Sequence, residues 1–281
     1  MPRLGSGTSL LALGVAAGFA FVGAAPKLAA ETGVSPPDFS SNDAAWVLAD
    51  RNGDYIPVPG KPSPTRNDPA YPHVGNGTGA QPTYRVADLT NPNIKPWAKA
   101  IMKRENDKVL AGGMGFSARQ SCLPAGVPAF MGYSVFESIH FVQTPKEVTM
   151  IFSGDEQVRR VYLDVPHSAH VKPSWYGESV GHYEGDTLIV DTIGMNDKTY
   201  LDGFRTPHTE KLHVVERYKL IDGGNTIQVT FTVEDADTFN EPWTAINNLR
   251  KVQRPWHEEI CAENNTHLFD YGMPVAERSD F

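Results

Sequence analysis

The stretch Thr226-Ile-Gln-Val-Thr-Phe-Thr-Val233 decides the fold class of this chain. Its apolar side chains alternate with Thr and Gln, and this period of two is typical of a β-strand with one buried face. The preceding Asp222-Gly-Gly-Asn225 supplies residues that tolerate the left-handed backbone a tight hairpin turn requires. We therefore expect a strand that follows a hairpin and points Ile227, Val229, Phe231 and Val233 toward a core.

The same alternation recurs along the chain from Ile139 onward. It covers residues 148–152, 158–163, 179–183, 187–192, 212–221, 243–252 and 257–261. Some eight or nine antiparallel strands with half-buried faces must either curl into a barrel or pair as two sheets. Because short turns join neighbouring strands, the sequence favours an all-β, antiparallel lipocalin-like barrel, with a β-sandwich as the alternative.

Two segments before the strands differ in composition. Residues 26–94 are rich in Pro and Gly, which favours an extended arm packing on the body over an independent core. The body spans residues 95–281 and opens with one short amphipathic helix over residues 97–110, because Pro96 suits a first turn and Gly112-Gly113 suits an end.

Residues 1–25 read as a secretory signal peptide. Arg3 precedes an apolar run from Leu10 to Val22, and small residues follow at Gly23 and Ala24. The run is shorter than the roughly 20 residues that a transmembrane helix needs. We expect a periplasmic or secreted protein without stable membrane insertion after cleavage, the alternative being an uncleaved anchor.

Charge and cysteine content narrow the classes further. The net charge of -8, with 33 acidic and 25 basic residues and no basic run, argues against nucleic acid as a partner. Cys122 and Cys261 are expected to form a disulfide in an oxidising compartment, the alternative being two separate buried thiols. Two cysteines do not make a structural zinc site.

Several motifs resemble a widespread family of exported bacterial proteins of unassigned function. These are Cys122-Leu-Pro-Ala-Gly-Val-Pro128, Arg159-Arg-Val-Tyr-Leu-Asp164, residues 173–192, Pro207-His-Thr-Glu210 and Val215-Glu-Arg217. The resemblance covers about residues 95–265 and implies a β-rich, calycin-like domain to which both cysteines belong. It implies no particular reaction.

Charged residues interrupt two of the expected apolar faces. Glu216 shares a face with Leu212, Val214 and Tyr218, and on the strand over 158–164 one face carries Arg160 and Tyr162. A lone buried charge costs several kcal/mol, so these residues need partners. They predict a polar cluster at the base of a ligand cavity, with an ordinary ion pair or a register shifted by one residue as the alternatives.

His208 lies in the loop before the strand of Glu216 and completes the predicted catalytic set of Glu216, His208, Arg160 and Tyr162. The predicted substrate-binding residues are Trp175, Tyr176, His167, Asp202 and Tyr218. A metal site at His167 and His170 would need a third ligand such as His182 or His208, and we predict neither a metal nor another cofactor.

Two functional classes follow from these residues. The first is an exported, cofactor-free enzyme that acts by acid–base chemistry on a small organic molecule, such as an aromatic or terpenoid compound, as a lyase, isomerase or hydrolase. The second is a periplasmic lipocalin-like protein that binds such a ligand without changing it. A structural or interaction protein would have no cavity. Buried ionisable groups favour the enzyme, since a carrier of apolar ligands needs fewer of them.

Overall fold

The computed structural model describes residues 35–40, 44–50, 54–72, 85–113, 115–116, 122–131 and 138–254. The described residues all belong to one compact unit. The predicted signal peptide, Cys261 and the strand expected over 257–261 lie outside the described residues, so these remain predictions. Within the described ranges, no helix has the length and apolar character that crossing a membrane requires.

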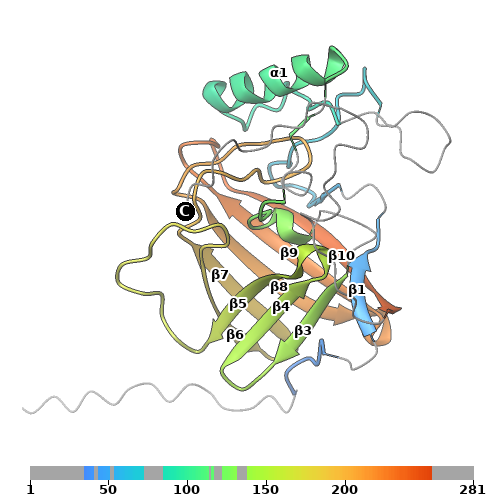
Figure 1. Ribbon diagram of the computed structural model, residues 1–281, viewed down its shortest axis with the longest axis vertical. Helices are drawn as coiled ribbons and strands as arrows, with labels where there is room; N and C mark the ends of the chain where they lie inside the picture. Colours follow the sequence, from blue (N-terminus) through green and yellow to red (C-terminus); the bar gives the residue numbers. More distant parts are fainter. Residues whose placement is uncertain are drawn as a thin grey trace, which may run out of the picture. The chain divides into compact units, whose positions relative to one another are not determined.

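The described fold is a closed β-barrel (Figure 1). Nine strands run around it in the order β1-β3-β4-β5-β6-β7-β8-β9-β10, and β1 pairs with both β3 and β10 to close the ring. A tenth strand, β2, pairs with β10. The strands are β1 (Ala44–Leu48), β2 (Ile56–Pro57), β3 (Ile139–Gln143), β4 (Glu147–Phe152), β5 (Gln157–Leu163), β6 (Glu178–Glu184), β7 (Thr187–Ile193), β8 (His213–Ile221), β9 (Thr226–Glu234) and β10 (Trp243–Gln253).

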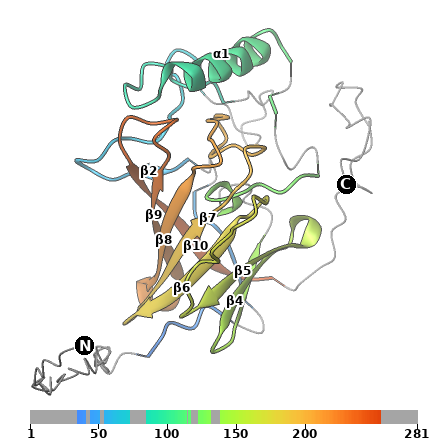
Figure 2. The ribbon, with the colours of Figure 1, turned by 90° about the vertical axis from the view of Figure 1, so that its left-hand side faces the viewer.

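Short helical turns and one α-helix complete the described part of the chain. The 3₁₀ turns are η3 (Ala129–Met131), η4 (Gly154–Glu156) and η5 (Asp222–Gly224), and the last joins β8 to β9 as the predicted hairpin. The helix α1 (Pro96–Leu110) lies beyond one end of the barrel in both views (Figures 1 and 2). Its start is held by the Trp97 indole, which donates to the Asp237 carbonyl at 2.6 Å. The predicted helix is confirmed.

The alternation that predicted β9 is also confirmed. Ile227, Val229, Phe231 and Val233 are all 0% exposed, as expected for one face of a strand pointing into a barrel. Large aromatic side chains, including Trp46 and Trp243, join them in the core. The all-β barrel is therefore correct, and the sandwich alternative is wrong.

One pair of strands departs from the antiparallel expectation. β5 and β6 run parallel, with Val161 opposite Ser179 and Leu163 opposite Gly181. Parallel neighbours need a crossover of a dozen or more residues, and residues 164–177 supply it. We call this segment the crossover loop. The barrel is thus mixed, and the crossover loop must return along the outside of the sheet before β6 begins.

The predicted arm contributes to the barrel itself. β1 pairs with β10 through five residues, from Ala44 opposite Gln253 to Leu48 opposite Leu249. Trp46 also faces Ile139 of β3, so β1 fills the gap between the first and last strands of the body. The arm therefore closes the barrel, a stronger role than the packing that its composition predicts.

Candidate functional site

A buried ion pair lies inside the barrel. The Arg159 guanidinium on β5 donates through Nη1 to Glu216 Oε1 at 3.0 Å and through Nη2 to Glu216 Oε2. Nη2 also donates to Thr192 Oγ1 at 2.9 Å and to Ser179 Oγ at 3.2 Å. The Tyr218 hydroxyl donates to Glu216 Oε1 at 2.8 Å. Every one of these five side chains is at most 2% exposed. We call them the interior cluster.

The electrostatics of the interior cluster are those of a closed network. Burial alone would lower the pKa of Arg159, but the facing Glu216 carboxylate outweighs it, and the pKa lies above its usual range. Burial, and then the charge of Glu216, raise the pKa of Tyr218 well above its usual value. The Arg159 guanidinium is therefore held in its charged form, and its donors are satisfied by neighbours. Such a network stabilises one arrangement of the core.

The interior partner of Glu216 is Arg159, whereas the sequence predicted Arg160. Glu216 lies inside as expected, but β5 is turned by one residue, so Arg159, Val161 and Leu163 point inward. Arg160 and Tyr162 lie on the outer face, where the Tyr162 side chain is 42% exposed. A shift of one residue exchanges the two faces of a strand, which is the alternative that the sequence left open.

His208 is buried, and its hydrogen bonds go to its own loop and not to the interior cluster. Its Nδ1 lies 3.0 Å from the Thr209 carbonyl and its Nε2 lies 2.8 Å from Thr199 Oγ1. The carbonyl must accept the Nδ1 proton, so Nε2 accepts from the threonine hydroxyl. Burial lowers the pKa of His208, which keeps the ring neutral. This geometry indicates a structural anchor of the loop before β8, and the catalytic role of His208 stays a prediction.

Asp202 is a second loop anchor. Its carboxylate accepts from the Phe204 amide at 2.9 Å and from the Thr206 hydroxyl at 2.7 Å. Burial among these neighbours raises its pKa, although the residue keeps some solvent exposure. The predicted substrate contact at Asp202 is therefore not supported by its surroundings, since its oxygens already hold the loop.

A pocket of about 360 Å³ lies beside β5, the crossover loop and the start of β6, and the exposed side chains of Val158, Arg160 and Tyr162 line it. The parallel ladder covers only Val161, Tyr162 and Leu163 of β5, and the preceding residues face the returning crossover loop. We call this the outer pocket. Its lining residues are Val158, Arg159, Arg160, Tyr162, His170, Val171, Lys172, Tyr176, Gly177, Glu178 and Ser179.

The crossover loop is held against the sheet by close packing and by hydrogen bonds. Gly194 has a φ of +70°, and a Cβ there would lie 2.3 Å from Val171 Cγ1, so only glycine lets the loop approach this closely. The Glu178 carboxylate accepts from the Ser168 amide at 2.7 Å and lies 3.1 Å from His167 Nδ1. Hydrogen bonding from the Ser168 hydroxyl is the main cause that lowers the pKa of Glu178.

The outer pocket combines cationic, aromatic and imidazole groups. Among the described residues, Arg160 has one weak partner, Glu147 Oε1 at 3.6 Å from its Nε, and both side chains are partly exposed. The His170 and Lys172 side chains make no hydrogen bond or ion pair with any residue that the structure describes. Tyr162 and Tyr176 add aromatic surface. Cations without strong internal partners beside aromatic rings suit a small anionic ligand.

The remaining residues of the predicted site lie at different positions in the structure. Tyr176 lines the outer pocket and packs edge-on against Phe130 at 5.6 Å between ring centroids. Trp175 lies apart from the outer pocket, with the Lys198 ammonium 6.0 Å from its ring centroid. Tyr218 belongs to the interior cluster. His167 contacts Glu178 and does not line the outer pocket. The predicted set is therefore not one site.

The alternative metal site does not assemble. His182 pairs with Glu184 at 3.2 Å, and His208 is held by its own loop, so neither joins His167 and His170. Over the ranges that the structure describes, no group of three His, Cys, Asp or Glu side chains has a geometry that could hold a metal ion.

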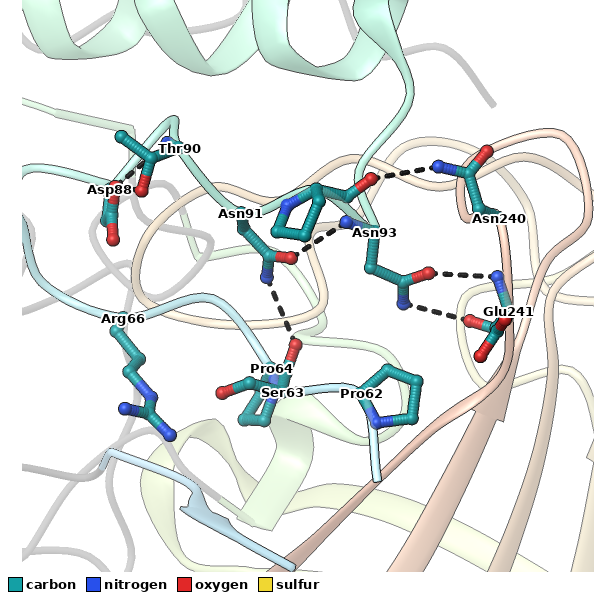
Figure 3. Close-up of a pocket in the computed structure, with 11 residues that line it drawn as sticks. Pro62, Ser63, Pro64, Arg66, Asp88, Thr90, Asn91, Asn93, Asn240 and Glu241 are labelled. Atoms are coloured by element: carbon teal, nitrogen blue, oxygen red, sulfur yellow. Dashed lines mark hydrogen bonds between the residues drawn. The ribbon is translucent and has the colours of Figure 1, made fainter. Parts of the chain in front are cut away.

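A larger pocket of about 570 Å³ lies between residues 62–66, residues 88–93 and the loop before β10 (Figure 3). Its asparagines are occupied in joining these segments: the Asn93 amide exchanges two hydrogen bonds of 2.9 Å with the backbone of Glu241, and the Asn91 amide donates to the Ser63 carbonyl. Among its described lining residues, Arg66 is the only cationic one and none is an imidazole. Despite its size, its described lining holds fewer cationic side chains than that of the outer pocket.

Comparisons of the chain with protein-family models, with curated proteins and with solved structures found no match.

Sequence reasoning missed Lys172 and Glu178 and considered His170 only as a metal ligand. The length of the segment between the strands at 158–163 and 179–183 could have identified the crossover loop, because a hairpin needs only a few residues. A parallel crossover with two histidines in it would then have drawn attention to the outer face.

Proposed function

We propose that this protein is an exported, cofactor-free enzyme that acts by acid–base chemistry on a small aromatic anion bound in the outer pocket. The observation that carries the proposal is the grouping of Arg160, Lys172 and His170 beside Tyr162 and Tyr176. The volume of about 360 Å³ lies within the range of small-molecule sites.

Each group has a role that follows from its chemistry. Arg160 and Lys172 would bind a carboxylate or phenolate and stabilise negative charge that develops during reaction. Tyr162 and Tyr176 would pack against an aromatic ring. His170 would give or take the proton, since imidazole is the side chain suited to proton transfer near neutral pH. Glu178 is bonded to Ser168 and His167, so its role is to hold the loop that carries His170.

A carrier that binds the same anion without changing it is the second candidate. It is favoured by the same contacts of Glu178, which engage the carboxylate of the outer pocket in holding the crossover loop and leave no carboxylate paired with His170 among the described residues. The two candidates share a ligand class and differ in whether His170 matters after binding.

The test uses phenylacetate, benzoate and 4-hydroxybenzoate as probes with the full chain. Calorimetry measures binding, and NMR in D₂O measures exchange of the acidic C–H of phenylacetate for deuterium, which reports proton transfer even when no product accumulates. His170→Gln should keep the affinity and lose exchange by roughly 10²- to 10⁴-fold. His182→Gln, on the exposed side of β6 outside the outer pocket, is the matched control.

Binding that persists in His170→Gln, with no deuterium exchange in the unaltered protein, would favour the carrier. Failure of all three probes to bind would contradict the proposed ligand class.

A further inference from the structure

A chain of alternating carboxylates and imidazoles runs across the outer face of β6–β9. His167 lies between Glu178 and Asp191, with Nδ1 3.1 Å from Glu178 Oε1 and Nε2 3.0 Å from Asp191 Oδ1. His213 lies between Asp191 and Glu234, with Nε2 3.0 Å from the same Asp191 Oδ1 and Nδ1 3.3 Å from Glu234 Oε2. We call these five residues the outer chain.

The strand register explains how the outer chain forms. Asp191 lies near the end of β7, His213 begins β8, and Glu234 ends β9 directly opposite His213. These positions meet at one end of the outer face, together with Glu178 at the start of β6. His167 is the exception, because it comes from the crossover loop and fits between two strands.

The contacts also show which hydrogen bonds the two imidazole rings can make in the outer chain. Both nitrogens of each imidazole face carboxylate oxygens, which only accept, so a doubly protonated ring is the form that donates to both. Each contact is partly exposed, with side-chain exposures from 22% to 50%, so each alone contributes little.

We propose that His213, which lies outside the outer pocket, is a positioning residue for it. His213 lies between Asp191 and Glu234, with one ring nitrogen facing each carboxylate, and thereby fixes Asp191. Asp191 in turn holds His167, and His167 with Ser168 holds the crossover loop on Glu178. That loop carries His170 and Lys172, so the outer chain sets the position of the wall that would bind the ligand. What the wall binds rests on the proposed function, whereas the positioning itself does not.

Amide hydrogen exchange of the full chain tests the positioning without a ligand. At one fixed pH, His213→Ala should speed exchange in the peptide containing the Ser168 amide by roughly two- to fivefold. His213→Arg supplies donors to both Asp191 and Glu234 and should return exchange close to that of the unaltered protein, while His213→Gln should fall between. His182→Ala, another exposed histidine paired with one carboxylate, is the control and should change nothing in the crossover loop.

Binding of 4-hydroxybenzoate to the same variants supplies the functional readout. Its dissociation constant should rise in His213→Ala by a similar factor and recover in His213→Arg. Exchange of the crossover loop that is equal in His213→Ala and His182→Ala would overturn the proposal, as would faster exchange through all strands without recovery in His213→Arg. If exchange behaves as expected but the unaltered protein binds no probe, positioning is supported and the proposed ligand class is wrong.

Discussion

Arg159 and Arg160 are adjacent in β5, but their side chains point to opposite faces of the sheet and have different roles. The Arg159 side chain is 1% exposed and donates to Glu216, Thr192 and Ser179, while that of Arg160 is 62% exposed and has one weak partner at 3.6 Å. The first arginine is committed to the fold, because a buried guanidinium must be paired. The Arg160 guanidinium keeps most of its N–H donors available to a ligand, as far as the described residues show. A charge on a strand therefore indicates a binding site only when its hydrogen bonds are not already made.

The largest expected effect comes from breaking the interior cluster. Glu216→Ala leaves the Arg159 guanidinium buried without its counter-ion, and should lower the free energy of unfolding by about 3–5 kcal/mol in urea titrations. The matched control is Glu184→Ala, which removes an exposed partner of Arg217 and should cost about 1 kcal/mol or less.

A double variant separates pairing from packing in the same cluster. Arg159→Met combined with Glu216→Leu removes both charges together and should recover much of the lost stability. A small effect of Glu216→Ala would instead mean that water reaches the cluster, which would weaken the distinction between the two arginines.

In contrast to Glu216→Ala, the variant Arg160→Ala should weaken ligand binding and leave the free energy of unfolding almost unchanged. Removing a cation from the outer pocket should weaken binding of 4-hydroxybenzoate by roughly tenfold, or about 1.4 kcal/mol, because a charge-assisted hydrogen bond is lost. The free energy of unfolding should change by no more than about 0.5 kcal/mol, as for other surface substitutions. Arg217→Ala, also an exposed arginine on the outer face, should leave affinity unchanged. Equal affinities of the two variants would contradict a role for Arg160.

The smallest effect concerns His208, which is buried like Arg159 and which we assign to the fold. Burial lowers its pKa, so the unfolded chain binds the proton more readily. Its contribution to stability is therefore present above the usual histidine pKa of about 6.5 and is lost as pH falls below it. The slope cannot exceed about 1.4 kcal/mol per pH unit, the limit for one proton.

His208→Gln keeps both hydrogen-bonding functions but cannot bind that proton. The difference in melting temperature between the unaltered protein and His208→Gln should shrink from pH 7 to pH 5.5. A constant difference across that range would show that His208 does not titrate with folding, and large loss of catalysis in a stable His208→Gln would restore the role that the sequence suggested.

The strand faces were predictable wherever one face was clearly apolar. Ile227, Val229, Phe231 and Val233 specify their side of β9 without ambiguity, and the tight turn before them fixes the hairpin. Glu216 was also placed correctly, because the apolar residues around it outnumber the charge.

β5 could not be placed by the same reasoning. Val158 and Tyr162 lie on one face and Val161 and Leu163 on the other, and each face holds one arginine. The local sequence pattern therefore favours neither face of β5 for the interior. The ion pair between Arg159 and the buried Glu216, which is far away in the sequence, fixes which face points inward. The barrel role of β1 was missed for a related reason, since its pairing with β10 joins segments about 200 residues apart and leaves no local pattern.

The candidate site was the least predictable part. Arg160, Tyr162 and Tyr176 were named from the sequence and do share a pocket, but on the outer wall of the barrel, where the crossover loop adds His170 and Lys172. Only the parallel pairing of β5 with β6 brings these segments together. Neither the alternation of apolar and polar residues nor the turn residues in the sequence predict that pairing.

A crystal structure of the protein with 4-hydroxybenzoate would show directly whether the ligand binds on the outer wall of the barrel. We expect the carboxylate to lie within hydrogen-bonding distance of Arg160 or Lys172, with the ring against Tyr162 or Tyr176, while Arg159 and Glu216 remain paired. A ligand inside the barrel beside Glu216, or in the larger pocket beside Arg66, would contradict the assignment of the outer pocket.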